Sequence, residues 1–108
     1  MKEGEDRTLG GYFHVHERPP AFEGADQCPY SVEIYVSDEA EPDGYGAALL
    51  FVRWSSGGDS ATGHLETPYL FFDTSPEGAR ARIGRLSLVE VKGLLDAAIA
   101  EQRRRPEW

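Results

Sequence analysis

The ten residues Tyr45–Trp54 (YGAALLFVRW) form the longest apolar run in the chain, and Arg53 is their only charged member. A β-strand turns successive side chains to opposite faces, so one face of this run would carry Ala47, Leu49 and Phe51. The other face would carry Ala48, Leu50, Val52 and Trp54. A strand that is apolar on both faces is normally covered on both faces. The sequence therefore predicts a central strand with a layer of structure against each side.

The chain length limits what can surround this strand. A chain of 108 residues is long enough for one domain with one core and too short for two ordinary domains. An apolar fraction of 40% and a charged fraction of 28% are typical of a soluble globular protein. We predict a flexible segment at residues 1–10, a single domain at residues 11–105 and a tail at residues 106–108.

Three further strands are predicted at residues 12–17, 30–37 and 62–72. Residues 30–37 alternate most clearly, with Tyr30, Val32, Ile34 and Val36 on one face. Residues 18–29 are expected to form a connection. In the last strand Leu65, Tyr69 and Phe71 would share one face and His64 and Glu66 the other. Pro68 in its middle predicts an edge position or a bulge, because proline cannot donate to a ladder.

The pattern changes to a helical period after residue 73. Ser75 followed by Pro76 and Glu77 is typical of a helix start. A second helix begins with a capping box formed by Ser87 and Glu90. Its apolar stripe consists of Leu88, Val91, Leu95, Ala98 and Ile99. The chain therefore has the order β-β-β-β-α-α and is expected to fold as an α+β domain, a four-stranded antiparallel meander with two C-terminal helices packed on one face.

This arrangement leaves the second face of the central strand without cover. Large apolar patches are rare on single-domain proteins. We therefore expect the open face, with Leu50, Val52 and Trp54, to pair with a second copy in a two-fold dimer. The alternative is a monomer in which the connection at residues 18–29 folds over that face.

A metal site is the second functional hypothesis. His14 and His16 would leave the same face of the first predicted strand, and His64 and Glu66 repeat this spacing on the fourth. If the two strands approach each other, three imidazoles and a carboxylate could bind zinc or another divalent ion with a position left for water. The same spacing also occurs on strands whose histidines only face solvent, and no stronger metal or catalytic motif is present.

Charge and cysteine content restrict the partners and the compartment. The formal net charge is −8, with −10 in residues 1–74 and +2 in residues 75–108. An acidic body argues against binding to nucleic acid. Arg80, Arg82 and Arg85 are best explained as a solvated helix face, and the alternative is a basic patch that binds an anion or an acidic partner. Only one cysteine, Cys28, is present and the first residues lack an apolar leader, so we predict a cytoplasmic protein with no membrane segment.

Taken together, these patterns favour a non-enzymatic protein-interaction or regulatory module that acts as a homodimer, with another protein as a further partner and no cofactor. The alternative is a divalent-metal-binding protein or metal-dependent hydrolase that uses His14, His16, His64 and Glu66. The two hypotheses differ in a simple structural way, because the second requires the imidazoles to converge.

Overall fold

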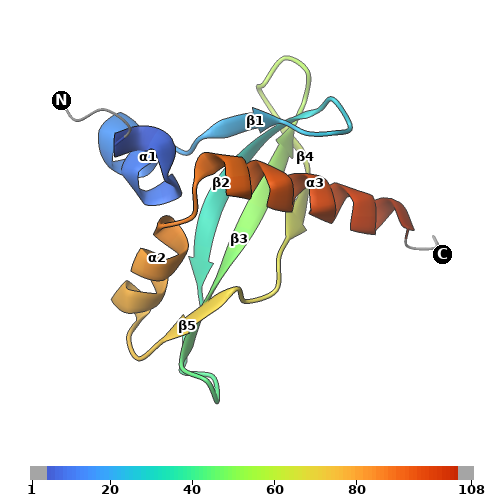
Figure 1. The fold of residues 1–108 in the computed structure, drawn as a ribbon. Coiled ribbons are helices and arrows are strands. Elements are labelled where there is room, and N and C mark those ends of the chain that lie inside the picture. Colours follow the sequence, from blue (N-terminus) through green and yellow to red (C-terminus); the bar gives the residue numbers. More distant parts are fainter. Residues whose placement is uncertain (1–4, 105–108) are drawn as a thin grey trace.

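The computed structural model describes residues 5–104. It has an α+β fold in which an antiparallel sheet is followed by two helices (Figure 1). The elements are η1 (Glu5–Arg7), α1 (Leu9–His16), β1 (Ala21–Glu23), β2 (Pro29–Val36), β3 (Tyr45–Trp54), β4 (Ala61–Glu66), β5 (Phe71–Asp73), α2 (Pro76–Gly84) and α3 (Leu88–Arg104). The predicted class and the predicted central strand are confirmed.

The sheet has the order β1-β2-β3-β4, and β5 also pairs with β3. Strand β3 lies in the middle and is antiparallel to β2 on one side. On its other side, β4 pairs with residues 50–54 and β5 with residues 45–47. The meander therefore has four positions across its width, and β4 and β5 share the fourth.

The helices cover one face of the sheet. Ala47, Leu49 and Phe51 of β3 are fully buried in the core. The helices contribute Leu9 from α1, Ala79 and Ile83 from α2, and Val91, Leu95 and Ile99 from α3. Figure 1 shows α3 crossing the strands, with α1 and α2 beside β2. One core therefore joins all three helices to the same side of β3.

The strand predicted at residues 12–17 is wrong, because these residues belong to helix α1 and its cap. The side chain of Thr8 accepts a hydrogen bond from the backbone of Gly11 at 3.1 Å and caps the helix. Leu9 is buried and Phe13, four residues later, packs against the core. A run of only six residues can fit the period of a strand or that of a helix. The spacing of four between the apolar residues Leu9 and Phe13 is the pattern that indicates a helix.

The predicted flexible segment at residues 1–10 is also partly wrong. Residues 8–10 cap and begin α1, and Leu9 is fully buried, so the domain starts before residue 11. Residues 1–4 and the predicted tail at residues 106–108 lie outside the described residues.

The connection at residues 18–29 does not lie over the open face. Its residues Ala21–Glu23 form β1, which pairs with the first part of β2 and extends the sheet sideways. Phe22 packs against the core on the helix side, together with Tyr30 opposite it. This segment therefore does not supply the cover required by the monomer alternative.

The strand predicted at residues 62–72 is interrupted where Pro68 predicted an irregularity. Between β4 and β5 the regular strand pairing is interrupted, and Thr67 takes its place with hydrogen bonds to β3. The hydroxyl of Thr67 accepts a hydrogen bond from the backbone amide of Leu49 at 3.0 Å. Its own amide donates to the Leu49 carbonyl at 3.0 Å, and the amide of Leu70 donates to that of Ala47 at 2.8 Å. The chain stays attached to β3 through this irregular stretch, so β5 continues along the same edge.

Both predicted helix starts are confirmed. Ser75 accepts a hydrogen bond from the Gly78 amide at 3.0 Å at the start of α2. At the start of α3, Ser87 and Glu90 exchange hydrogen bonds of 2.8 and 3.0 Å, as a capping box requires. Among the described residues, no helix is long and apolar enough to cross a membrane.

Candidate functional site

The face of the sheet that points away from the helices carries a group of apolar and aromatic side chains. We call it the open face and define it as Tyr35, Ala48, Leu50, Val52, Trp54, Tyr69 and Phe72. Strand alternation assigns the residues of β3 to it, because Ala47, Leu49 and Phe51 point into the core. Tyr35 is 49% exposed, whereas Leu50, Val52 and Trp54 are half-buried. Leu50, Val52 and Trp54 therefore lie on one face of β3, opposite the core residues.

Three aromatic rings gather at one end of the open face. The rings of Tyr35 and Tyr69 stack, with centroids 6.3 Å apart and planes inclined by 14°. Phe72 meets Tyr69 edge to face at 5.8 Å. Burial and the neighbouring Tyr35 raise the pKa of Tyr69 above its usual value. Such pairs add stabilisation beyond the area that they bury.

The position of Tyr69 corrects a prediction. Leu65 and Phe71 pack against the core as expected, but Tyr69 lies on the opposite face and stacks on Tyr35. The irregular stretch around Pro68 breaks the alternation, so the face cannot be counted through it. The absence of a side chain at Gly46 makes room for the ring, since a Cβ there would lie 2.6 Å from Cγ of Tyr69.

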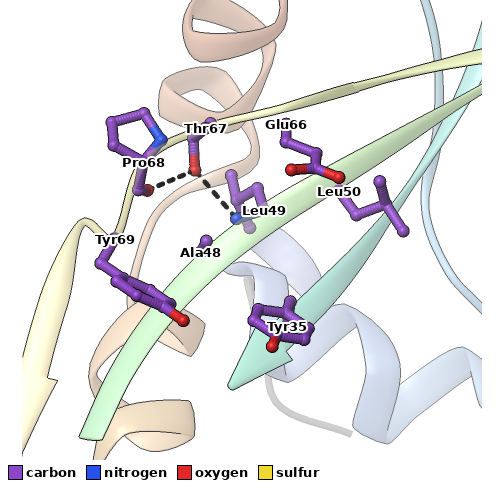
Figure 2. Close-up of a pocket in the computed structure, with 8 residues that line it drawn as sticks. All are labelled: Tyr35, Ala48, Leu49, Leu50, Glu66, Thr67, Pro68 and Tyr69. Carbon is purple, nitrogen blue, oxygen red and sulfur yellow. Dashed lines mark hydrogen bonds between the residues drawn. The ribbon is translucent and has the colours of Figure 1, made fainter. Parts of the chain in front are cut away.

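A hollow of about 570 Å³ lies on the open face beside these rings, and Figure 2 shows the residues that line it. It is lined by Tyr35, Ala48, Leu49, Leu50, Glu66, Thr67, Pro68 and Tyr69. A second hollow of about 400 Å³ adjoins it and is also lined by Leu50 and Glu66, together with Val52 and His64. Together the two hollows therefore lie along Leu50 and Val52 of β3, with Glu66 and His64 of β4 on one side and Glu33 of β2 opposite Leu50 on the other.

Trp54 lies at the far end of β3 and is hydrogen-bonded to the neighbouring strand. Its indole Nε1 donates a hydrogen bond of 2.9 Å to the hydroxyl of Ser31 on β2. Half-buried indoles need such a partner for their polar group and leave the rest of the ring available for contact. The open face therefore has aromatic side chains at both ends.

The predicted metal ligands do not come together. His14 and His16 lie on helix α1, where His16 Nε2 is 3.0 Å from a carboxylate oxygen of Asp6. His64 and Glu66 project from β4, and their side chains are 3.7 Å apart. Within residues 5–104, no group of three or more His, Cys, Asp or Glu side chains is arranged to hold a metal ion. The convergence on which the hypothesis depended required residues 12–17 to be a strand.

The three arginines of the predicted anion patch have different surroundings. Arg82 donates to a carboxylate oxygen of Asp73 at 2.9 Å, and this hydrogen bond lowers the pKa of Asp73. Arg80 and Arg85 instead line a hollow between α1, α2 and β2. The patch is therefore divided, with one arginine in an ion pair and two beside a groove that the sequence did not predict.

Comparisons with known proteins identify no relative. No protein-family model matches the chain, and no curated protein or solved structure is significantly similar to it. The functional argument therefore depends on the surfaces of the structure alone.

Proposed function

We propose that this chain is a non-enzymatic protein-interaction module that forms a two-fold homodimer through the open face. The observation that carries the proposal is the apolar strip of Leu50, Val52 and Trp54 on the face of β3 that no helix of the described chain covers. Apolar groups on such a face gain free energy when a partner removes them from water.

The anatomy of the face also supports pairing. Its centre is apolar and aromatic, and its charged residues, Glu33, His64 and Glu66, stand at the sides opposite Leu50 and Val52. Protein interfaces have the same arrangement of an apolar centre and a polar rim. A two-fold dimer applies one such patch to its own copy and is the commonest assembly.

The dimensions of the sheet indicate the strength of the contact. The five strands contain 30 residues, and with strands about 4.8 Å apart and a rise of about 3.3 Å per residue they define a face of roughly 480 Å². Two copies would bury roughly 950 Å², which is the size of a weak, transient interface. We therefore expect a concentration-dependent equilibrium between monomer and dimer, which suits a regulatory role. The proposed location is the cytoplasm, where the reducing conditions suit the free thiol of Cys28.

Sedimentation velocity over a range of about 1 to 300 µM tests the dimer. The informative variant is Leu50→Lys, because the residues opposite position 50 on the two neighbouring strands are Glu33 and Glu66. A lysine there gains favourable cross-strand pairs in the monomer but must be desolvated in the dimer. Val89→Lys is the matched control, since Val89 is 82% exposed on α3 and the change in charge is the same.

The native chain is expected to move from 12.0 kDa towards twice that mass as its concentration rises. Leu50→Lys should stay monomeric over the same range, and Val89→Lys should behave as the native chain. A native chain that stays at 12.0 kDa throughout, or a Val89→Lys variant that loses the dimer equally, would show that the open face is not the interface.

A further inference from the structure

Strand β2 has a partly unpaired edge. Strand β1 pairs only with residues 29–31 of β2, and one more hydrogen bond of 3.3 Å joins the Val32 amide to the Pro20 carbonyl. Beyond that point, no strand in the described part of the chain pairs with Glu33–Val36 on the side away from β3. Figure 1 shows that this side of β2 faces α1 and α2.

The backbone groups at this edge can be assigned from the ladder. The Ser37 amide donates to the Gly46 carbonyl on β3 at 2.9 Å, whereas the Val32 amide points to the other side. Backbone groups of successive residues alternate between the two sides of a strand. The amides and carbonyls of Ile34 and Val36 therefore point to the unpaired edge, where an added strand could bind them.

A groove of about 630 Å³ lies at the start of this edge, beside Glu33 and Ile34. It is lined by Thr8, Gly10, Phe13, Glu33, Ile34, Arg80, Ala81, Gly84 and Arg85. Glu33 and Ile34 point to opposite faces of the sheet, so a groove that touches both must reach the strand edge. Phe13 and Ile34 also pack against the core, which gives the groove an apolar and rigid base.

Helices α1 and α2 form the walls of the groove and meet closely. A Cβ at Gly10 would lie 3.2 Å from the carbonyl oxygen of Gly84, so the two backbones are nearly in contact. A single extended chain, with a strand spacing of about 4.8 Å, is narrow enough to enter such a groove. A second copy of the domain would bring its own α1 and α2 against these walls, and for this reason the edge does not suit edge-to-edge self-pairing.

The charge of the groove indicates which kind of segment it would bind. Arg80 and Arg85 are exposed, and neither takes part in an ion pair within residues 5–104, whereas Arg82 is held by Asp73. Glu33 is the only acidic residue in the lining. The groove is therefore basic on a chain whose net charge is −8, and it attracts acidic segments.

We propose that this groove captures an extended, acidic segment of another polypeptide, which adds to β2 as a strand. The added segment would pair its backbone with Ile34 and Val36 and place carboxylates beside Arg80 and Arg85. This inference names a partner chemistry for the interaction role proposed above, but it does not require the dimer, because the groove and the open face share only Glu33, which lies at the border of both.

The probe is an acetylated and amidated octapeptide, Thr-Val-Thr-Glu-Thr-Val-Thr-Glu, titrated to about 2 mM into labelled protein and followed by amide NMR shifts. Two altered peptides distinguish the contribution of backbone hydrogen bonds from that of charge. One is N-methylated at alternate residues, and the other has lysine in place of glutamate. The titration is done on the native chain and on Leu50→Lys, so that a failure of the dimer does not affect the result. The protein variant is Arg80→Glu combined with Arg85→Glu, and its control is Arg103→Glu on exposed α3.

The expected result is a set of shifts centred on the Ile34 and Val36 amides in both proteins. N-methylation should weaken binding about tenfold, the loss expected for two backbone hydrogen bonds. The lysine peptide and the double arginine variant should also bind more weakly, while Arg103→Glu should not. Unchanged Ile34 and Val36 amides at the highest probe concentration, equal binding of the N-methylated peptide, or shifts confined to the open face would each overturn the proposal.

Discussion

The two faces of β3 carry similar side chains but are stabilised in different ways. On the helix side Ala47, Leu49 and Phe51 have no exposed surface. On the open face Leu50 and Val52, their direct neighbours in sequence, remain half-buried. Hydrophobicity alone does not distinguish the two faces. The difference is that α1, α2 and α3 all pack against one of them.

This contrast shows what an apolar strand does and does not specify. The helix-covered face is closed by residues that α2 and α3 bring to it, and its stability belongs to the single chain. Within residues 5–104, the contacts of the open face are cross-strand and aromatic contacts of the sheet itself, and no helix packs on it. The same strand therefore supports folding on one side and, in our proposal, association on the other.

Truncating adjacent leucines gives the largest expected difference between the faces. Leu49→Ala should lower the free energy of unfolding by about 3 kcal/mol, since it removes a fully buried side chain and leaves a cavity. Leu50→Ala should cost about 1 kcal/mol or less, because the side chain is already partly in water. Urea unfolding at about 1 µM keeps association out of the comparison. Equal losses would mean that the open face is covered within the monomer.

The hydroxyl of Tyr30 tests the edge of the covered face. It donates a hydrogen bond of 2.8 Å to Asp26, and burial together with this bond raises the pKa of Tyr30 to about 12. Tyr30→Phe should lower the free energy of unfolding at pH 7 by about 2 kcal/mol, a typical value for a hydrogen bond to a charged group. Tyr45→Phe is the control, because its hydroxyl has no hydrogen bond within residues 5–104.

The effect of Tyr30→Phe should depend on pH in two ways. Burial raises the pKa of Asp26, but hydrogen bonds from Tyr30 and Cys28 outweigh it and leave the pKa lowered. The stabilisation is therefore present above the unfolded pKa of about 3.9 and disappears as pH falls through the folded value. At the alkaline end, the raised pKa of Tyr30 stabilises the native chain below about pH 10, and this is lost as pH rises towards about 12. Urea titrations of both proteins from acid to alkaline pH measure the difference, and parallel curves would contradict it.

A methyl group at Gly46 tests the aromatic end of the open face. Gly46→Ala places a Cβ 2.6 Å from the Tyr69 ring, so the ring must leave its position between Tyr35 and Phe72. We expect a loss of about 1 to 2 kcal/mol. Gly93→Ala on α3 is the matched control, since a Cβ there meets nothing within 4 Å and should stabilise the helix by about 0.5 to 1 kcal/mol. A neutral Gly46→Ala would show that the ring cluster contributes little.

The sequence predicted the elements whose local signals agree with one another. Strand β3 is apolar on both faces, which is typical of a central strand, and the Ser87–Glu90 box marks the start of α3. Alternation was also sufficient to place Leu50, Val52 and Trp54 on one face. The strand prediction for residues 12–17 was wrong because six residues are too few to distinguish the period of a strand from that of a helix. The contacts of Leu9 and Phe13 that decide between them are with distant parts of the chain.

The rest of the candidate surfaces depends on tertiary structure. Tyr69 was assigned to the wrong face because the irregular hydrogen bonds of Thr67 change the alternation, and Pro68 indicates that a break exists but not its geometry. The groove beside Arg80 and Arg85 could not be predicted at all, since one of its walls is α1. Sequence patterns locate faces within an element, whereas a groove requires the relative positions of several elements.

A change in salt concentration should have the smallest effect, and it tests which forces hold the proposed dimer together. Each chain carries −8, so a dimer carries twice that charge and its formation is opposed by repulsion at low ionic strength. Raising NaCl from 10 to 150 mM shortens the Debye length from about 30 to about 8 Å and should lower the dimer dissociation constant roughly threefold to tenfold. Leu50→Lys should remain monomeric at both concentrations. A dissociation constant that rises with salt would mean that opposite charges hold the copies together, and would contradict a dimer formed through the apolar open face.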